Sequence, residues 1–111
     1  MNRRSVEIHG LADARRALAA GGPVELRTPP GAAGYLGPAL FKAMIDEARA
    51  EFPDADMTAV LDCGDAPGTA LSALRLGVEA VAVEAPAPVL QRLRAIAHRT
   101  GGRVIGTARD D

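Results

Sequence analysis

Two rhythms of apolar and polar residues alternate along the chain. In the first pattern, apolar and polar residues alternate one by one or a short run is entirely apolar, and this pattern predicts strands. These strands cover residues 4–9, 24–28, 57–61, 78–83 and 103–105. The other is a recurrence of apolar residues every three or four positions, and it predicts amphipathic helices. These helices cover residues 11–20, 38–52, 67–76 and 87–99.

Strands and helices therefore alternate strictly, which favours right-handed crossovers and a parallel sheet. The apolar runs at 57–61 and 78–83 are typical of central strands, and the polar alternation of 4–9 indicates a less buried strand. We predict an α/β fold: a three-layer α/β/α sandwich with a mostly parallel five-stranded sheet, flavodoxin-like, in a single domain over residues 1–111. Residues 106–111 are expected to be a polar tail. The length is too short for a full (β/α)₈ barrel, which needs about 250 residues.

Composition narrows the classes of function. The formal charge is −1 and only two Phe and one Tyr are present, so neither a basic surface nor a stacking platform favours nucleic acid as a partner. No apolar run approaches the ~20 residues that span a bilayer, so no membrane association is expected. No secretory signal is visible, which makes the cytoplasm the expected location. Cys63 is the single cysteine, so the chain can form no internal disulfide and has no cysteine cluster for a structural zinc. The sequence leaves the identity of any cofactor unknown.

Candidate chemistry lies where each strand ends, because ligands of open parallel sheets bind beyond the carboxyl ends of the strands. The residues there are His9, Thr28, Asp62, Cys63 and Glu84. If the strand order were 2-1-3-4-5, His9 would lie near Asp62 and Cys63. A cysteine activated by an imidazole is a workable nucleophile. The alternative is that Cys63 is a small buried residue and His9 an exposed strand end.

Three acidic residues have both chemical and structural interpretations. Asp62 resembles the phosphoacceptor of response-regulator receiver domains, which also carry an acidic pair after the first strand and a lysine after the fifth. Here those places hold His9-Gly10 and Gly106-Thr107, so the phosphorylation chemistry does not follow. The favoured alternative is that Asp62 is a loop residue that accepts hydrogen bonds from local backbone amides. Asp65 is expected to cap the following helix, with Pro67 in its first turn. Glu84 and Asp62 could form a carboxylate pair for acid–base work or Mg²⁺, or could be solvated loop charges.

The segment 29–37 is rich in glycine and proline and precedes a predicted helix. Gly31, Gly34 and Gly37 could let backbone amides cradle an anion, although the segment matches no phosphate-binding motif. The alternative is a surface loop. Near the C-terminus, Arg92, Arg99, Arg103 and His98 form a basic patch that could meet an acidic partner or simply be a solvated helix face.

Two functions remain open. The first is a non-enzymatic binding or interaction module, with a homodimer or another protein as a possible partner. The second is a small enzyme or ligand-binding domain for a phosphorylated or carboxylated metabolite at the carboxyl ends of the strands.

Overall fold

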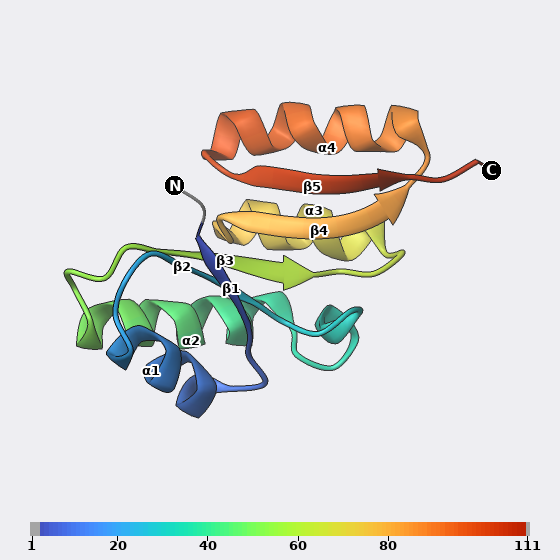
Figure 1. Ribbon diagram of the computed structural model, residues 1–111. Coiled ribbons are helices and arrows are strands. Elements are labelled where there is room, and N and C mark those ends of the chain that lie inside the picture. The colour runs from blue at the N-terminus through green and yellow to red at the C-terminus, as the bar shows by residue number, and fades with distance from the viewer. Residues whose placement is uncertain (1–2, 111) are drawn as a thin grey trace.

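A computed structural model describes residues 3–110 (Figure 1). The five strands are β1 (Arg4–Glu7), β2 (Val24–Arg27), β3 (Met57–Asp62), β4 (Ala80–Ala85) and β5 (Arg103–Ala108). The helices are α1 (Leu11–Ala19), α2 (Pro38–Glu51), α3 (Pro67–Leu76) and α4 (Ala87–Thr100), with a short 3₁₀ turn, η1 (Ala32–Gly34), before α2. Within residues 3–110, no helix combines the length and the apolar character needed to cross a membrane.

The predicted α/β class with a parallel five-stranded sheet is confirmed, because five parallel strands in one sheet alternate with four helices. The boundaries of all five strands differ from the prediction, by one residue at β2 and β3 and by more at β1, β4 and β5, and β1 ends at Glu7 rather than at residue 9. β4 begins two residues later than predicted, and β5 continues to Ala108. The polar tail expected from residue 106 is therefore wrong for 106–108. All six residues of β5 pair in register with β4, and this ladder outweighs the low strand propensity of Gly106.

The arrangement of the layers differs from the three that were predicted. The strand order is β1-β2-β3-β4-β5, so each crossover steps to the next position in the same direction. Right-handed crossovers of that kind place every helix on the same face of the sheet. Consistently, α1 packs beside α2, α2 beside α3 and α3 beside α4. Figure 1 shows this row of helices following the curved sheet, from α4 above β5 to α1 and α2 below the other strands.

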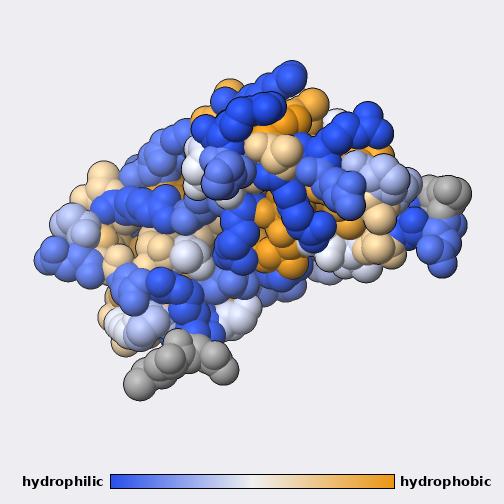
Figure 2. Space-filling view, turned by 90° about the horizontal axis from the view of Figure 1, so that it is seen from above, coloured by the Kyte–Doolittle hydropathy of each residue, from blue (hydrophilic) through white to orange (hydrophobic). Residues whose placement is uncertain are grey.

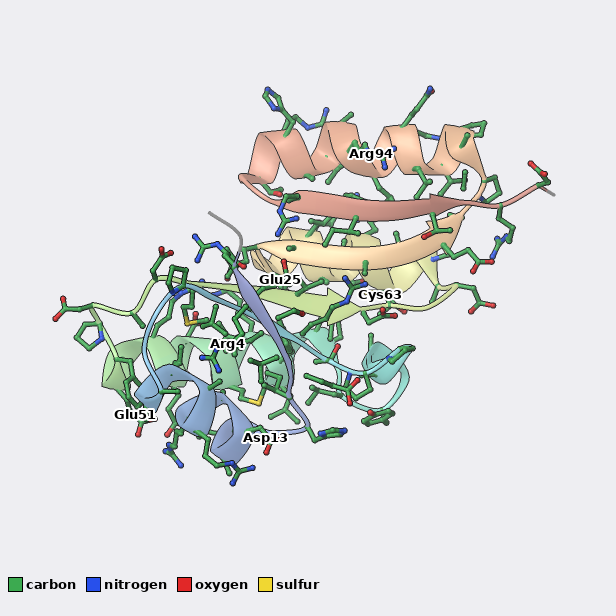
Figure 3. All side chains as sticks on the ribbon, in the orientation of Figure 1. Arg4, Asp13, Glu25, Glu51, Cys63 and Arg94 are labelled. Atoms are coloured by element: carbon green, nitrogen blue, oxygen red, sulfur yellow. The ribbon has the colours of Figure 1, made fainter. Side chains whose placement is uncertain are left out.

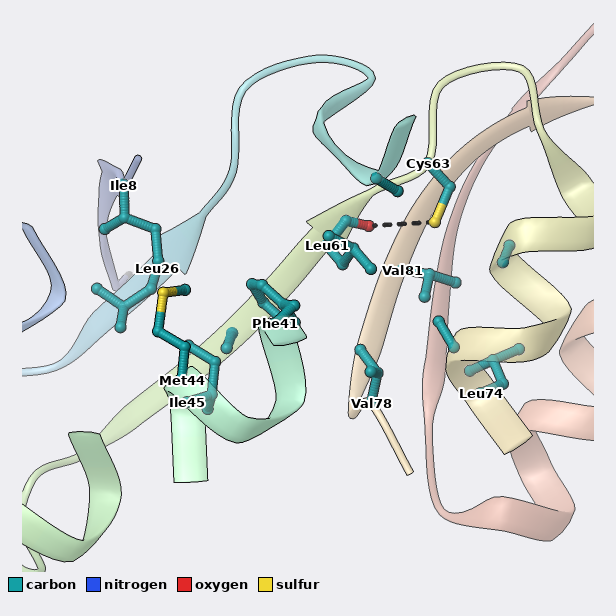
Figure 4. Close-up of a cluster of buried hydrophobic side chains, with 14 of the residues drawn as sticks. Ile8, Leu26, Phe41, Met44, Ile45, Leu61, Cys63, Leu74, Val78 and Val81 are labelled. Atoms are coloured by element: carbon teal, nitrogen blue, oxygen red, sulfur yellow. Dashed lines mark hydrogen bonds between the residues drawn. The ribbon is translucent and has the colours of Figure 1, made fainter. Parts of the chain in front are cut away.

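The main core lies between the sheet and this row of helices. Ile8, Leu61 and Val81 from the strand side meet Phe41 and Leu74 from the helices, and all five are almost completely buried (Figure 4). The core residues of each strand are alternate residues, whose side chains all point to the same face of the sheet. The hydrophobic effect therefore drives assembly on one face of the sheet.

The opposite face, which we call the helix-free face, has only a small cluster of its own. Val60, Ala80 and Ala82 are buried there although the described helices all pack elsewhere. Small residues leave room for long side chains above them, and the Arg103 guanidinium reaches across from β5 to within 3.9 Å of a Glu25 oxygen on β2. A pair of opposite charges thus spans this face from β5 to β2.

Candidate functional site

A hollow of about 440 Å³ opens at the carboxyl ends of the strands, partly on the helix-free face. We call it the carboxyl-edge hollow. It is lined by Arg27, Pro30, Asp62, Gly64, Asp65, Ala82, Val83, Glu84, Ile105 and Thr107. A smaller hollow on the β1 side shares Arg27, Pro30 and Asp62 with it. The parallel strands therefore bring polar ends from β2, β3, β4 and β5 to one place.

Hydrogen bonds hold the Asp62 side chain in one position within this hollow. Its Oδ1 accepts hydrogen bonds from the backbone N–H groups of Gly31 and Gly64, each at 2.9 Å. Its own N–H donates to Thr28 Oγ1 at 2.9 Å, and its Oδ2 lies 3.5 Å from the Arg27 guanidinium. The carboxylate is only 14% exposed. Asp62 therefore ties the loops after β2 and β3 together, and the structure brings Thr28, Gly31 and Asp62 into one network.

Glycine is required where these two loops meet. Gly31 and Gly64 both have positive φ, +71° and +55°. A Cβ at Gly64 would lie 3.4 Å from the Gly31 Cα, so the two backbones pass close together. These glycines shape the turns that aim their amides at Asp62.

The other amides of segment 29–37 also have partners inside the protein. The N–H of Gly34 donates to the Gly31 carbonyl and the N–H of Ala32 to that of Pro29, within η1 and its approach. Gly37 precedes the first turn of α2. The N–H groups of Gly31 and Gly34 are therefore already hydrogen-bonded, to Asp62 and to the loop's own backbone. This geometry gives no support to an anion-binding site at those two amides.

Cys63 faces the core rather than the hollow. It is 3% exposed, and its Sγ lies 3.8 Å from the Leu61 carbonyl oxygen (Figure 4). Burial, with a smaller contribution from the negative charge of Asp62, raises the pKa of the Cys63 thiol to about 12. At neutral pH the thiol is protonated, so it is a poor nucleophile.

We expect a matching reactivity pattern. In the folded protein at pH 7, Cys63 should react with a maleimide or a disulfide reagent at least tenfold more slowly than in denaturant, because both access and thiolate are lacking. The raised pKa also predicts a stability contribution that is present below pH 9, the unfolded value, and is lost as the pH rises toward 12. Equal rates in the folded and denatured protein would contradict this placement of Cys63.

His9 lies elsewhere on the molecule. It follows β1, and β2 separates it from β3 in the sheet. Its ring nitrogens lie 3.4 Å from a Glu7 oxygen and 3.3 Å from an Asp13 oxygen, and its backbone N–H donates to Asp13 at 2.8 Å. That backbone hydrogen bond is the main reason why the pKa of Asp13 is lowered. The order 2-1-3-4-5 would have brought His9 close to Cys63, but in the observed order the two residues are not neighbours.

Asp65 and Glu84 both line the carboxyl-edge hollow. The predicted capping role of Asp65 is wrong, since α3 has Ala66 at its N-cap and no side-chain capping hydrogen bond. Pro67 stands in the first turn of α3 as predicted. Asp65 is thus left to face solvent in the hollow. Among residues 3–110, no group of three or more His, Cys, Asp or Glu side chains is arranged to hold a metal ion.

The sequence analysis overlooked Arg27. It pairs with Asp62 and lines both hollows at this edge. The signal was present in β2, where Val24 and Leu26 are buried and Glu25 and Arg27 occupy the alternate positions. A charged residue at the last position of an inner strand points to the helix-free face at the carboxyl edge.

Comparison with other proteins adds no identity to this site. No protein-family model matches the sequence, and no curated protein has significant similarity to it.

Proposed function

We propose that this chain is a non-enzymatic binding module and that a small ligand occupies the carboxyl-edge hollow. The observation that supports this most strongly is that one polar side chain of the hollow is bonded within the protein while others are exposed. Asp62 is fully engaged in holding the two loops, whereas Asp65, Glu84 and Thr107 line the same space with exposed side chains. A rigid base with polar groups free to meet a ligand is typical of a binding site.

The charge of the hollow favours one class of ligand. Three carboxylates, Asp62, Asp65 and Glu84, face a single guanidinium, that of Arg27, which leaves an excess of two negative charges at neutral pH. The hydroxyl of Thr107 and the apolar side chain of Ile105 complete the lining. A small amine with hydroxyl groups therefore suits the hollow better than an anion does.

The phosphorylated or carboxylated metabolite is the second candidate, and Arg27 is the feature that favours it. Guanidinium groups bind carboxylates and phosphates well. However, the Arg27 guanidinium already lies 3.5 Å from Asp62, and an anion would have to compete with that carboxylate. Catalysis gains no support from Cys63, because its thiol is buried and protonated at neutral pH.

A thermal-shift series tests the choice of ligand class. The probes are amino sugars and short polyamines on one side, and phosphate, citrate and sugar phosphates on the other. A bound ligand at a hundred times its dissociation constant adds about 2.7 kcal/mol of stability, which is easily measured. We expect stabilisation by members of the first set. Stabilisation by the anions alone would favour the second candidate, and no shift with either set would contradict a small-ligand site.

Variants locate the site. The side chains of Glu84 and Asp65 form no hydrogen bond or ion pair with other residues in the range 3–110. Glu84→Gln and Asp65→Asn therefore remove a charge from the hollow without breaking an internal contact, and we expect each to weaken amine binding by about tenfold while leaving the melting temperature unchanged. Asp54→Asn is the matched control, because Asp54 is an equally exposed acidic residue in the turn before β3. If the control weakens binding as much as the hollow variants do, the attraction is diffuse and the site is not the hollow.

A further inference from the structure

β5 is a free edge of the sheet. It is the last strand in the order, and the N–H groups of Arg103 and Arg109 donate to the carbonyls of Glu79 and Ala85, at 2.8 and 3.1 Å. Alternate residues of a strand direct their peptide groups to opposite sides. The peptide groups of Val104, Gly106 and Ala108 therefore face away from β4. Within residues 3–110 no strand pairs with them.

This edge lacks the features that usually protect edge strands. Its six residues pair with β4 without interruption, and they include no proline and no lysine. The other edge strand, β1, is shorter and carries charges at both ends, Arg4 and Glu7. The two edges thus differ, and only β5 offers a long, regular row of hydrogen-bonding groups to another strand.

A basic groove runs beside this edge, between α4 and β5. It has a volume of about 250 Å³, and Arg94, His98 and Arg103 are the titratable residues in its lining, with no acidic residue among them. Ala97, Gly102 and Val104 complete it. Figure 3 places Arg94 on α4, over β5. The groove lies on the helix-covered side of β5, so it is a different surface from the carboxyl-edge hollow.

The charges of this groove are largely uncompensated. The Arg103 guanidinium turns away from the groove, over the helix-free face, to within 3.9 Å of a Glu25 oxygen. Arg94 and His98 have no ion-pair partner in the described part of the chain. Arg92 and Arg99 add two more exposed positive charges on the same helix. In Figure 2, which looks down on α4, hydrophilic side chains cover most of the surface, with hydrophobic ones showing between them.

We propose that an acidic, extended peptide segment of a partner protein pairs with β5 as a sixth strand, with its carboxylates in the groove beside Arg94 and His98. The free edge supplies the backbone hydrogen bonds of β-strand addition, and the groove selects for acidic side chains at alternate positions. A second copy of this chain is the poorer occupant, because pairing of two β5 edges would bring the basic grooves of both copies together.

A fluorescent peptide tests the proposal by anisotropy against the full chain. The probe is an alternating Val-Glu peptide of about eight residues, and the control is its Val-Lys counterpart with similar strand propensity. We expect the Val-Glu peptide to bind and the Val-Lys peptide not to bind. Hydrogen exchange should then show protection of the outward N–H groups of Val104, Gly106 and Ala108. Absence of binding, or equal binding of both peptides, would overturn the proposal.

Two kinds of variant measure separately how much the backbone hydrogen bonds of β5 and the positive charge of the groove contribute to peptide binding. Ala108→Pro removes an outward N–H that the fold does not use, and Ala108→Ser keeps it, so only the proline variant should weaken binding. The double substitution Arg94→Gln with His98→Gln should weaken binding by about tenfold, while Arg75→Gln, at an exposed arginine on α3, should not.

The remaining outcomes are equally decisive. Equal losses in the Arg75 and the Arg94/His98 variants would show unspecific charge attraction and overturn the proposed groove. Sedimentation that shows a dimer abolished by Ala108→Pro would assign the edge to a second copy and overturn the peptide. Because Glu84→Gln alters only the carboxyl-edge hollow, it should leave peptide binding unchanged, so failure of one proposal is distinguishable from failure of the other.

Discussion

Replacement of Phe41 with alanine is expected to lower the free energy of unfolding by about 3–5 kcal/mol. Phe41 is 1% exposed and lies in the main core between α2 and the sheet, among strand residues such as Leu61 (Figure 4). Its removal takes away a large apolar surface and leaves a cavity that the rigid strands cannot close. Urea unfolding followed by circular dichroism measures the change.

The neighbouring residue supplies the control. Leu40 is in the same helix but is 62% exposed, so Leu40→Ala should change the stability by less than about 0.5 kcal/mol. The pair of variants therefore measures which side of α2 faces the core. Equal losses in the two variants would contradict the orientation of α2.

Replacement of Asp62 with alanine is expected to cost about 2–4 kcal/mol, although Asp62 is polar and lies at the edge of the sheet. The loss arises because two backbone N–H groups, those of Gly31 and Gly64, would lose their shared acceptor in a partly buried place. The loops after β2 and β3 should then loosen, and amide hydrogen exchange at Gly31 and Gly64 should accelerate.

Asp62→Asn distinguishes the two interactions of this side chain. The amide oxygen of asparagine can still accept from Gly31 and Gly64, so this variant should lose about 1 kcal/mol, mainly the attraction of Arg27. A loss as large as that of Asp62→Ala would show that the Arg27 pair, rather than the backbone hydrogen bonds, holds the loops.

Several site residues were predictable because local rules decide them. A polar residue directly after a buried strand must lie at the carboxyl edge, and this rule located Thr28, Asp62 and Glu84. One role was predictable as well, because an aspartate in a loop commonly accepts from local backbone amides, as Asp62 does from the Gly64 N–H. The long-range contacts were not predictable. The Asp62 carboxylate binds an amide 31 residues earlier in the chain, and no local pattern encodes that contact. Asp65 similarly fits the residue preference of an N-cap, yet the turn before α3 puts Ala66 in that position.

The amino-acid sequence by itself determined the alternation of strands and helices, the parallel direction of the strands and the burial of β3 and β4, since periodicity and crossover handedness are local properties. Only the tertiary structure decided the strand order, and with it the single layer of helices, the separation of His9 from Cys63 and the free edge of β5. The physical reason is that strand order depends on which apolar faces pack best over long separations along the chain, and the hydrophobic pattern of each element is the same for several orders.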